Sequence, residues 1–258
     1  MFQKLTNHIY VRPFERYTDR PNVGLICGAK RALLFDAGNS ATHVASIKQE
    51  LTAAGLPYPD YVALSHWHWD HTFGACAWDA GIIACRDTNN QLCQMQNWNW
   101  DDRSMQERVD SGADIAFCTE MIKREYPDRS QIRVSTADII FDHRLSLELG
   151  GGVVCELIHA HGPHSDDSVI CYVPSDSFVF LSDSYGKDLY GLPWHFDIAH
   201  EDDFSSAVAA LPYDPNRVKA YLCLLDTLDF THCMGGHGNV KTRKDLYHSF
   251  GDHIALSN

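Results

Sequence analysis

The sequence has no long apolar run, no basic cluster and no closely spaced pair of cysteines, and each absence excludes a class of protein. No run of about 18 apolar residues occurs, so we expect no transmembrane helix. The N-terminal segment is charged and lacks the apolar stretch of a secretion signal. Nine cysteines are present without a C-x-x-C pair, which argues against a disulfide scaffold. Together these features predict a cytoplasmic protein.

The negative net charge argues against nucleic acid as a binding partner. The 258-residue chain has a formal net charge of -13, and its 21 Lys and Arg residues form no basic run that would bind phosphates. Hydrophobic residues make up 45% of the chain, which is enough for a sizeable core. We therefore expect a small-molecule substrate as partner, with no nucleic acid and no membrane, and the composition is compatible with a homodimer.

The apolar pattern predicts strands in two groups, with helices between and after them. Residues 23–38 are typical of two strands around a turn, and residues 60–66 of a short buried strand. Residues 40–55 have helical spacing, with Ser40 as a candidate N-cap and Gly55 at the end. Further expected elements are a short helix at 73–81, strands from residue 132, a hairpin at 168–183, and helices at 215–228 and 241–256.

The chain is expected to form one domain. No linker rich in Pro, Gly or Ser divides it, and strands inside with helices outside would bury one common core. We therefore predict a single domain over residues 1–258. Residues 87–128 are polar and helix-compatible and interrupt the strand pattern, which predicts a helical insertion at this point.

The strongest chemical signal is the stretch "SHWHWDHTFG" at residues 65–74. His66 and His68 stand two apart at the end of a predicted strand, where alternate side chains point the same way. Both imidazoles can therefore reach one metal ion. Asp70 and His71 follow where the chain turns into a helix, so a second pair of donors points to a nearby position. This register predicts two adjacent metal ions rather than a chance cluster of polar residues.

More ligands are needed, because each ion takes about four or five donors. The stretch "HAHGPHSDDS" offers His159, His161 and His164. Asp183 ends an apolar strand, and His237 follows two glycines in "CMGGHG". Each donor stands where a strand meets a loop, so all of them can converge at one edge of the sheets.

The order H-x-H-x-D-H, a histidine after a Gly/Pro turn, an aspartate after an apolar strand and a late G-H-G resembles the metallo-β-lactamase superfamily. The resemblance runs from "LLFDAG" to "GGHG" and implies an α+β fold, an αββα sandwich of two mixed β-sheets flanked by helices. It implies that the first metal is bound by His66, His68 and His164, the second by Asp70, His71 and His237, and that Asp183 bridges both. His161 is the alternative to His164, and Asp36 in "FDAG" matches a supporting position.

The resemblance also limits which activities of the superfamily we expect for this chain. β-lactamases of this fold usually lack the bridging aspartate, and the helical domain of glyoxalase II has no counterpart after His237. What remains is a dinuclear metal-dependent hydrolase of a small-molecule ester, thioester, lactone or phosphodiester. Two divalent metal ions, zinc or else iron or manganese, would share a hydroxide that Asp70 and Asp183 hold in place. The alternative is an oxidoreductase of the same fold, a persulfide dioxygenase with a single iron.

Two segments are candidates for substrate binding. Residues after Asp183 would stand beside the metals, and Lys187 among them could hold an anionic group. The insertion brings Trp98 and Trp100, which would diverge by about 200° on a helix, so that one could face the substrate. The candidate substrate residues are Tyr185, Lys187, Tyr190, Trp194, Trp98 and Trp100. The alternatives are that these aromatic residues belong to the core, or that the insertion mediates dimer contact.

Overall fold

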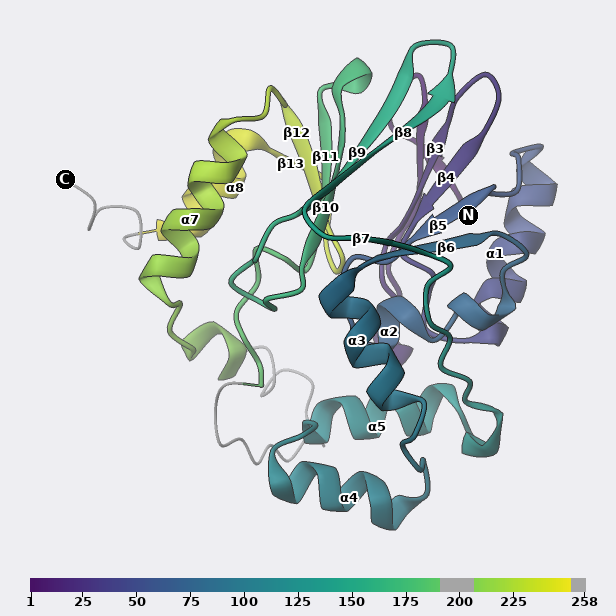
Figure 1. The fold of residues 1–258 in the computed structure, drawn as a ribbon, viewed down its shortest axis with the longest axis vertical. Helices are drawn as coiled ribbons and strands as arrows, with labels where there is room; N and C mark the ends of the chain where they lie inside the picture. Colours follow the sequence, from purple (N-terminus) through teal and green to yellow (C-terminus); the bar gives the residue numbers. More distant parts are fainter. Residues whose placement is uncertain (191–206, 252–258) are drawn as a thin grey trace.

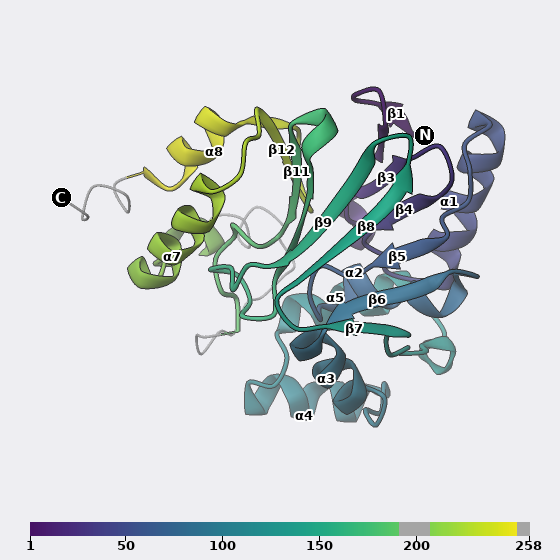
Figure 2. The ribbon, with the colours of Figure 1, turned by 45° about the horizontal axis from the view of Figure 1, so that its top comes forward.

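The computed structural model describes residues 1–190 and 207–251, in which two β-sheets pack face to face between layers of helices. Figures 1 and 2 show helix α1 outside one sheet, and helices α7 and α8 outside the other. Helices α3, α4 and α5 lie together at one end of the molecule (Figure 1). This arrangement confirms the αββα sandwich that the sequence motifs predicted.

The first sheet has seven strands in sequence order, antiparallel from β1 to β4 and parallel from β4 to β7. Its strands are β1 (Gln3–Lys4), β2 (Ile9–Arg12), β3 (Val23–Cys27), β4 (Ala32–Phe35), β5 (Tyr61–Ala63), β6 (Gly81–Cys85) and β7 (Ile139–Phe141).

The second sheet has six strands in the order β13-β12-β11-β10-β9-β8. Only the β11–β12 pair among them is parallel, so this sheet is mixed as well. Its strands are β8 (Arg144–Gly150), β9 (Val153–His159), β10 (Val169–Val173), β11 (Phe178–Ser182), β12 (His232–Gly235) and β13 (Lys241–Thr242).

The alternation of side chains along the strands builds three apolar layers. In β4, Leu33 and Phe35 point into the core between the sheets, while Leu34 packs under the helices outside the first sheet. In β11, Phe178 faces the core between the sheets and Val179 faces the layer under α7 and α8. Strands buried on both faces read as continuous apolar runs, which explains their clear signal in the sequence.

The helices begin and end at recognisable residues. The side chain of Ser40 accepts a hydrogen bond from the backbone N–H of His43 and caps α1, and Gly55 ends this helix in the left-handed conformation. The helices are α1 (Ala41–Ala54), α2 (Trp69–Thr72), α3 (Arg86–Met95), α4 (Asp102–Ser111), α5 (Ala116–Glu125), α7 (Pro215–Asp226) and α8 (Arg243–Ser249), with 3₁₀ helices η1 (Arg16–Thr18), η2 (Ala75–Ala77), η3 (Arg129–Gln131) and η4 (Pro174–Asp176).

Most of the expected elements are present, and two differ. Residues 87–128 contain α4, α5 and most of α3, as the composition predicted. Of the short helix expected at 73–81, only the 3₁₀ helix η2 forms, and the α-helical turn α2 comes earlier, directly after His68. In the predicted helix at 241–256, α8 covers Arg243–Ser249, and residues 252–256 lie outside the described residues. In the described part of the chain, no helix has the length and apolar character of a membrane span.

Candidate metal centre

The expected donors all lie at one edge of the sandwich, where strands end. His66 follows β5, and the next residues turn into α2, which carries Asp70 and His71. Asp183 directly follows β11, and His237 comes just after β12. The first sheet and the second sheet therefore both supply side chains to the same place.

The first cluster consists of three buried histidines. His66 Nε2 lies 2.8 Å from His68 Nδ1, and His164 Nε2 lies 3.1 Å from the same atom. Because three nitrogens converge at one point, the cluster can bind a single metal ion. The structure brings His164 into this cluster, whereas His161 is exposed and stacks on His159 at 3.8 Å between ring centroids.

The second cluster lies beside the first and contains two carboxylates and two imidazoles. Asp70 Oδ2 lies 2.8 Å from His71 Nε2 and 3.1 Å from His237 Nε2. Asp183 Oδ2 is 3.5 Å from the Nε2 atoms of both His71 and His237. The same oxygen lies 3.9 Å from Nε2 of His164 in the first cluster. Asp183 therefore stands between the two clusters, where one carboxylate can serve both.

In three of the ligand rings, the protein holds Nδ1 on the far side, so that Nε2 faces the cluster. Nδ1 of His71 lies 2.8 Å from Asp36 Oδ2, and Nδ1 of His164 lies 2.7 Å from the carbonyl oxygen of Lys187. Nδ1 of His66 lies 2.9 Å from the hydroxyl of Ser65. These contacts place the proton on Nδ1 and leave the lone pair on Nε2 directed at the cluster, as in known metal sites.

Behind the ligands, the backbone is strained at two supporting residues. Asp36 has φ 69° and Ser182 has φ 48°, both in the left-handed region that costs non-glycine residues about 1–3 kcal/mol. The hydroxyl of Ser182 donates to Asp36 Oδ2, and the hydroxyl of Ser65 donates to Ser182. Because Ser182 immediately precedes Asp183, this network fixes the position from which the shared carboxylate projects.

The electrostatics of the two clusters differ. Burial and neighbouring imidazoles hold the pKa values of His66 and His68 well below the usual range, so both rings are neutral. Burial also lowers the pKa of His237, but Asp183 and Asp19 outweigh it and raise this pKa to about 9. Burial raises the pKa of Asp183, but His237 and His71 outweigh burial and keep this pKa well below its usual value. The ionised carboxylates of the second cluster therefore attract positive charge.

The chemistry of this donor set fits divalent metal ions. His71 Nε2 is fully buried and has no hydrogen-bond partner, although it points at two carboxylates. A bound cation would satisfy this nitrogen, since a buried polar atom without a partner is costly. The position before His237 requires glycine. A Cβ at Gly236 would lie 2.3 Å from Asp183 Oδ1, so any side chain there would displace the carboxylate.

A cavity of about 470 Å³ opens over the clusters. Its floor includes His68, Asp70, Asp183 and the other ligands His164 and His237. Its walls are mostly apolar, from Phe14, Phe117, Met121, Leu189 and Val208. The volume and the apolar lining with a few polar groups are typical of small-molecule sites.

The three described substrate candidates of the segment after Asp183, which are Tyr185, Lys187 and Tyr190, all line this cavity. Lys187 lines it, but its ammonium donates to the carbonyl oxygen of Ala209 at 2.7 Å. Tyr185 lines it with a ring that packs against Gly235. The hydroxyl of Tyr190 lies near Asp114 and Cys118 instead of the ligands.

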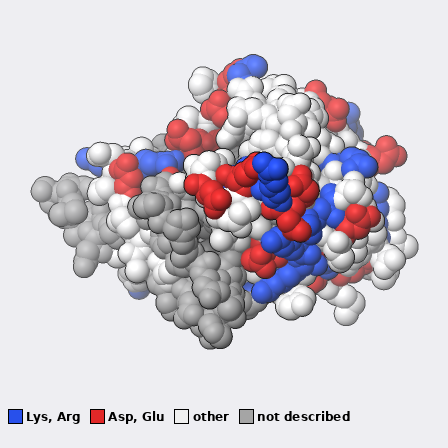
Figure 3. Space-filling model, turned by 90° about the horizontal axis from the view of Figure 1, so that it is seen from below, with Lys and Arg blue, Asp and Glu red and all other residues white. Residues whose placement is uncertain are grey.

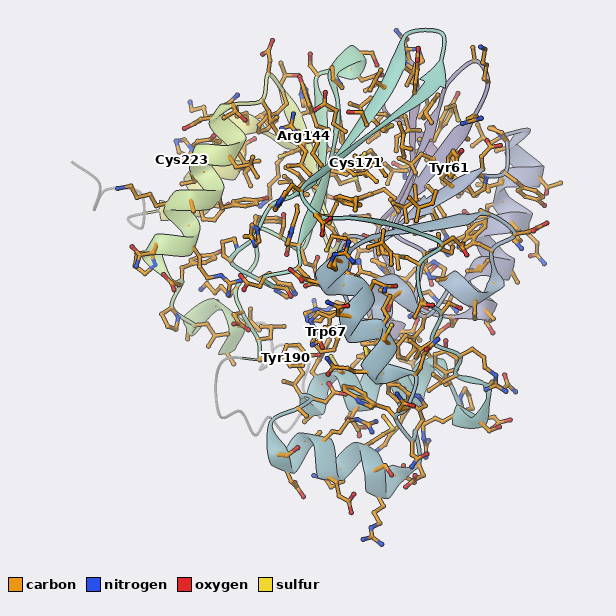
Figure 4. The ribbon with its side chains drawn as sticks, viewed as in Figure 1. Tyr61, Trp67, Arg144, Cys171, Tyr190 and Cys223 are labelled. Carbon is orange, nitrogen blue, oxygen red and sulfur yellow. The ribbon has the colours of Figure 1, made fainter. Side chains whose placement is uncertain are left out.

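The ring of Tyr190 supports a ligand. It packs on the imidazole of His68 at 4.9 Å and on Trp67 at 5.0 Å between centroids. Figure 4 shows Trp67 and Tyr190 side by side. Trp194, the fourth expected substrate residue of this segment, lies outside the described residues.

The tryptophans of the insertion do not reach the cavity. Trp98 and Trp100 follow the end of α3 in non-helical backbone, so the helical divergence expected for them was wrong, and their rings lie 5.8 Å apart. The guanidinium of Arg108 packs against both rings, at 4.6 and 4.8 Å from their centroids. Among the described residues of the insertion, only Phe117, Cys118 and Met121 of α5 line the cavity.

The loop between β2 and β3, residues 13–22, supplies Phe14, Arg16 and Asp19 to the cavity, and no motif in the sequence predicted this contribution. Asp19 Oδ1 lies 3.6 Å from Nδ1 of the ligand His237. Asn22 in the same loop is buried, and its side-chain amide donates to the carbonyl oxygens of Gly235 and Gly238 at 2.8 Å. The loop that carries His237 is thereby fixed by a residue more than 200 positions earlier in the chain.

Solved structures resemble this chain along nearly its whole length. A metallo-beta-lactamase from Pontibacter korlensis matches with a TM-score of 0.62 and 15% identity, over 98% of both chains. The DIM-1 metallo-beta-lactamase matches with a TM-score of 0.60 and 14% identity, over 100% of this chain and 98% of the other. A metallo-beta-lactamase family protein from Thermus thermophilus matches with a TM-score of 0.62 and 16% identity, over 98% and 81% of the two chains.

At such low identities these structures show the fold alone. No curated protein matches the sequence. The family profile described as "Metallo-beta-lactamase superfamily" matches residues 16–211, which include six of the seven metal-ligand candidates and most of the chain. The chain therefore belongs to the metallo-beta-lactamase superfamily.

Proposed function

We propose that this protein is a hydrolase of small molecules that uses two divalent metal ions. The observation that carries the proposal is the position of Asp183, whose Oδ2 lies within 3.9 Å of ligand nitrogens from both clusters. A site for one ion would not need the complete second set formed by Asp70, His71 and His237. The ions favoured by this mixture of imidazole and carboxylate are zinc, with iron or manganese as alternatives.

The residues of the site have distinct tasks. His66, His68 and His164 would hold one ion through ring nitrogens, and Asp183 would serve both ion positions from between the two clusters. Asp70 adds a second carboxylate beside His71 and His237. When bound, the two ions supply a hydroxide nucleophile near neutral pH and stabilise the negative charge that develops on the attacked group. No serine or cysteine nucleophile is required.

The cavity supports a small substrate. Its apolar walls exclude water around the reacting group, and its size suits an ester, thioester, lactone or phosphodiester. Lys187 and Tyr185 lie on its lining and are candidates to contact the substrate directly. Tyr190 acts through His68, because its ring packs on that ligand while its hydroxyl faces α5.

The test combines elemental analysis of the purified protein with a panel of chromogenic ester, thioester, lactone and phosphodiester substrates. We expect two ions per chain and turnover of at least one class. One iron per chain, with oxygen consumption on a persulfide and no hydrolysis, would instead establish the dioxygenase. Light scattering on the same sample measures whether the protein is a dimer.

A further inference from the structure

The ligand His164 lies in a loop without regular structure, and an arginine of α7 holds this loop from outside. The loop covers residues 160–168 between β9 and β10 and contains neither helix nor strand. We propose that Arg217, which neither belongs to a donor cluster nor lines the cavity, is a positioning residue that keeps His164 in place for the first metal ion. The proposal rests on the metal binding of the function proposed above.

The guanidinium of Arg217 contacts the loop on both sides of His164. Its Nη2 donates a hydrogen bond to the carbonyl oxygen of Gly162 at 2.6 Å, two residues before the ligand. The same nitrogen lies 3.3 Å from Oδ1 of Asp166, two residues after the ligand. Hydrogen bonds from a charged donor are stronger than those between neutral groups. Arg217 therefore restrains the loop where no backbone ladder does.

The other terminal nitrogen of Arg217 reaches the segment that holds the ring of His164. Nη1 forms an ion pair with Oδ2 of Asp188 at 3.7 Å. Next to Asp188, the carbonyl oxygen of Lys187 lies 2.7 Å from Nδ1 of His164. Oδ1 of Asp188 accepts a hydrogen bond from the backbone N–H of Tyr190 at 2.9 Å, so this carboxylate is fixed on both sides. One guanidinium thus joins the loop of the ligand to the segment that orients its ring.

The loop and this segment also pack closely, so a shift of one would move the other. A Cβ at Gly162 would lie 2.3 Å from the carbonyl oxygen of Ser184. A Cβ at Gly186 would lie 3.3 Å from Nδ1 of His164. Glycine at both positions allows this close approach of the two backbones. Because Arg217 holds both partners, its loss should change the position of the His164 ring.

The stability of α7 does not explain an arginine at this position. Arg217 lies in the first turn of the helix, where the partial positive charge of the N-terminus disfavours a cation. The side chain of Asp214 caps the helix by accepting from the backbone N–H groups of Asn216 and Arg217. Nε of Arg217 is buried without a hydrogen-bond partner, which is a further cost. The contacts of Arg217 with the loop offset these costs.

Arg217 also differs from the exposed ion pairs of the surface. Figure 3 shows Lys and Arg side chains interspersed with Asp and Glu on the face seen from below. In the pair of Arg103 and Glu107, for example, the side chains are 86% and 60% exposed. Such pairs contribute little, because water and salt screen them. The side chain of Arg217 is only 26% exposed, and its shortest bond goes to a backbone oxygen of the ligand loop.

The experiment measures zinc binding by competition with a chromogenic chelator, which gives one affinity for each cluster. His164→Ala and His237→Ala show which affinity belongs to which cluster, because each removes a ligand of only one. In Arg217→Gln, the zinc affinity of the first cluster should fall about 10-fold, as when a residue that supports a ligand is lost, while that of the second stays at the wild-type value. Arg217→Lys keeps a charged donor and should restore part of the affinity.

The matched control is Arg243→Gln. The guanidinium of Arg243 also donates to two backbone carbonyl oxygens, those of Leu225 and Leu228. It pairs with Asp226 at 2.9 Å, and its side chain is 32% exposed, close to the value for Arg217. Both Gln variants should lower the melting temperature of the metal-free protein, but only Arg217→Gln should lose zinc affinity. Unchanged affinity of the first cluster in Arg217→Gln, or an equal loss in Arg243→Gln, overturns the proposal.

A measurement on the metal-free protein separates this proposal from the proposed function. The Nδ1–H of His164 donates to the carbonyl oxygen of Lys187, and its proton resonance is identified by its loss in His164→Ala. In Arg217→Gln, this proton should exchange with water about 10-fold faster, the factor expected when one hydrogen bond from a charged group is lost. If the wild type binds fewer than two ions, the dinuclear hydrolase is excluded and the exchange rate still tests Arg217. Exchange as slow in Arg217→Gln as in the wild type then overturns the proposal.

Discussion

Replacing Asn22 tests whether the β2–β3 loop positions a metal ligand. In Asn22→Ala, the N–H of Phe14 and the carbonyl oxygens of Gly235 and Gly238 lose their side-chain partner. Three such hydrogen bonds contribute about 0.5–1.5 kcal/mol each, so the free energy of unfolding should fall by about 2–4 kcal/mol. For a chain of this size, the melting temperature should decrease on the order of 10 °C.

The more specific effect concerns the second metal ion. Because Asn22 holds both sides of the loop around His237, its loss should displace that ligand, and outer contacts of this kind change metal affinity by about 10- to 100-fold. Competition with a chromogenic chelator measures the affinities of both ions, and only the affinity at the site formed by Asp70, His71, Asp183 and His237 should fall. Asn97→Ala, which removes one exposed asparagine bond to Cys93, is the control. If Asn22→Ala loses stability but keeps wild-type affinity for both ions, the reasoning is refuted.

Four further predictions follow from the site and its surroundings. Asp183→Ala and His68→Ala should each abolish turnover while the circular dichroism spectrum stays native, because Asp183 follows the end of β11 and His68 precedes α2, so that neither lies within a strand or in an apolar cluster. Near wild-type rates in Asp183→Ala would contradict its bridging position. His164→Ala should lose metal in elemental analysis and His161→Ala should not, since only the first lies in the cluster. Arg108→Ala should lower stability by about 1–2 kcal/mol in denaturant unfolding without changing KM, because it packs on Trp98 and Trp100 away from the cavity. Burial raises the pKa of Asp114 from 3.8 to about 6, so the contribution of this carboxyl group to stability is present below pH 4 and is lost as pH rises through 6. At pH 7.5, the free energy of unfolding of Asp114→Asn should therefore exceed that of the wild type by on the order of 2–3 kcal/mol. At pH 4 the two proteins should be equally stable.

Local spacing made the centre of the site visible in the sequence. His66, His68, Asp70 and His71 lie within six positions at the end of a strand, and their geometry follows from strand and helix periodicity. Asp183 could be found because an apolar strand precedes it directly. The helix α1 was equally predictable, since its cap and its end are both set by residues next to it in the chain.

The features of the site that could not be predicted from the sequence depend on contacts between residues far apart in the chain. Asn22 owes its role to bonds with residues 213 and 216 positions away, and nothing in the sequence around it signals them. Trp98 and Trp100 failed as substrate residues because a helical spacing was assumed where α3 had already ended at Met95. Their packing partner Arg108 comes from the next helix, so only the tertiary structure reveals the stack.

The metal ligands come from both sheets, so the metal centre also affects how the two sheets are held together. The first sheet supplies His66 and its neighbours up to His71, whereas the second sheet supplies His164, Asp183 and His237. Each bound ion would therefore join the two sheets at the edge of the sandwich. Behind them, the hydrogen bonds from Ser65 to Ser182 and from Ser182 to Asp36 make the same connection without metal, above a shared apolar core. Because this protein-only link already aligns the ligands, binding adds stability by mass action to a site that is formed beforehand.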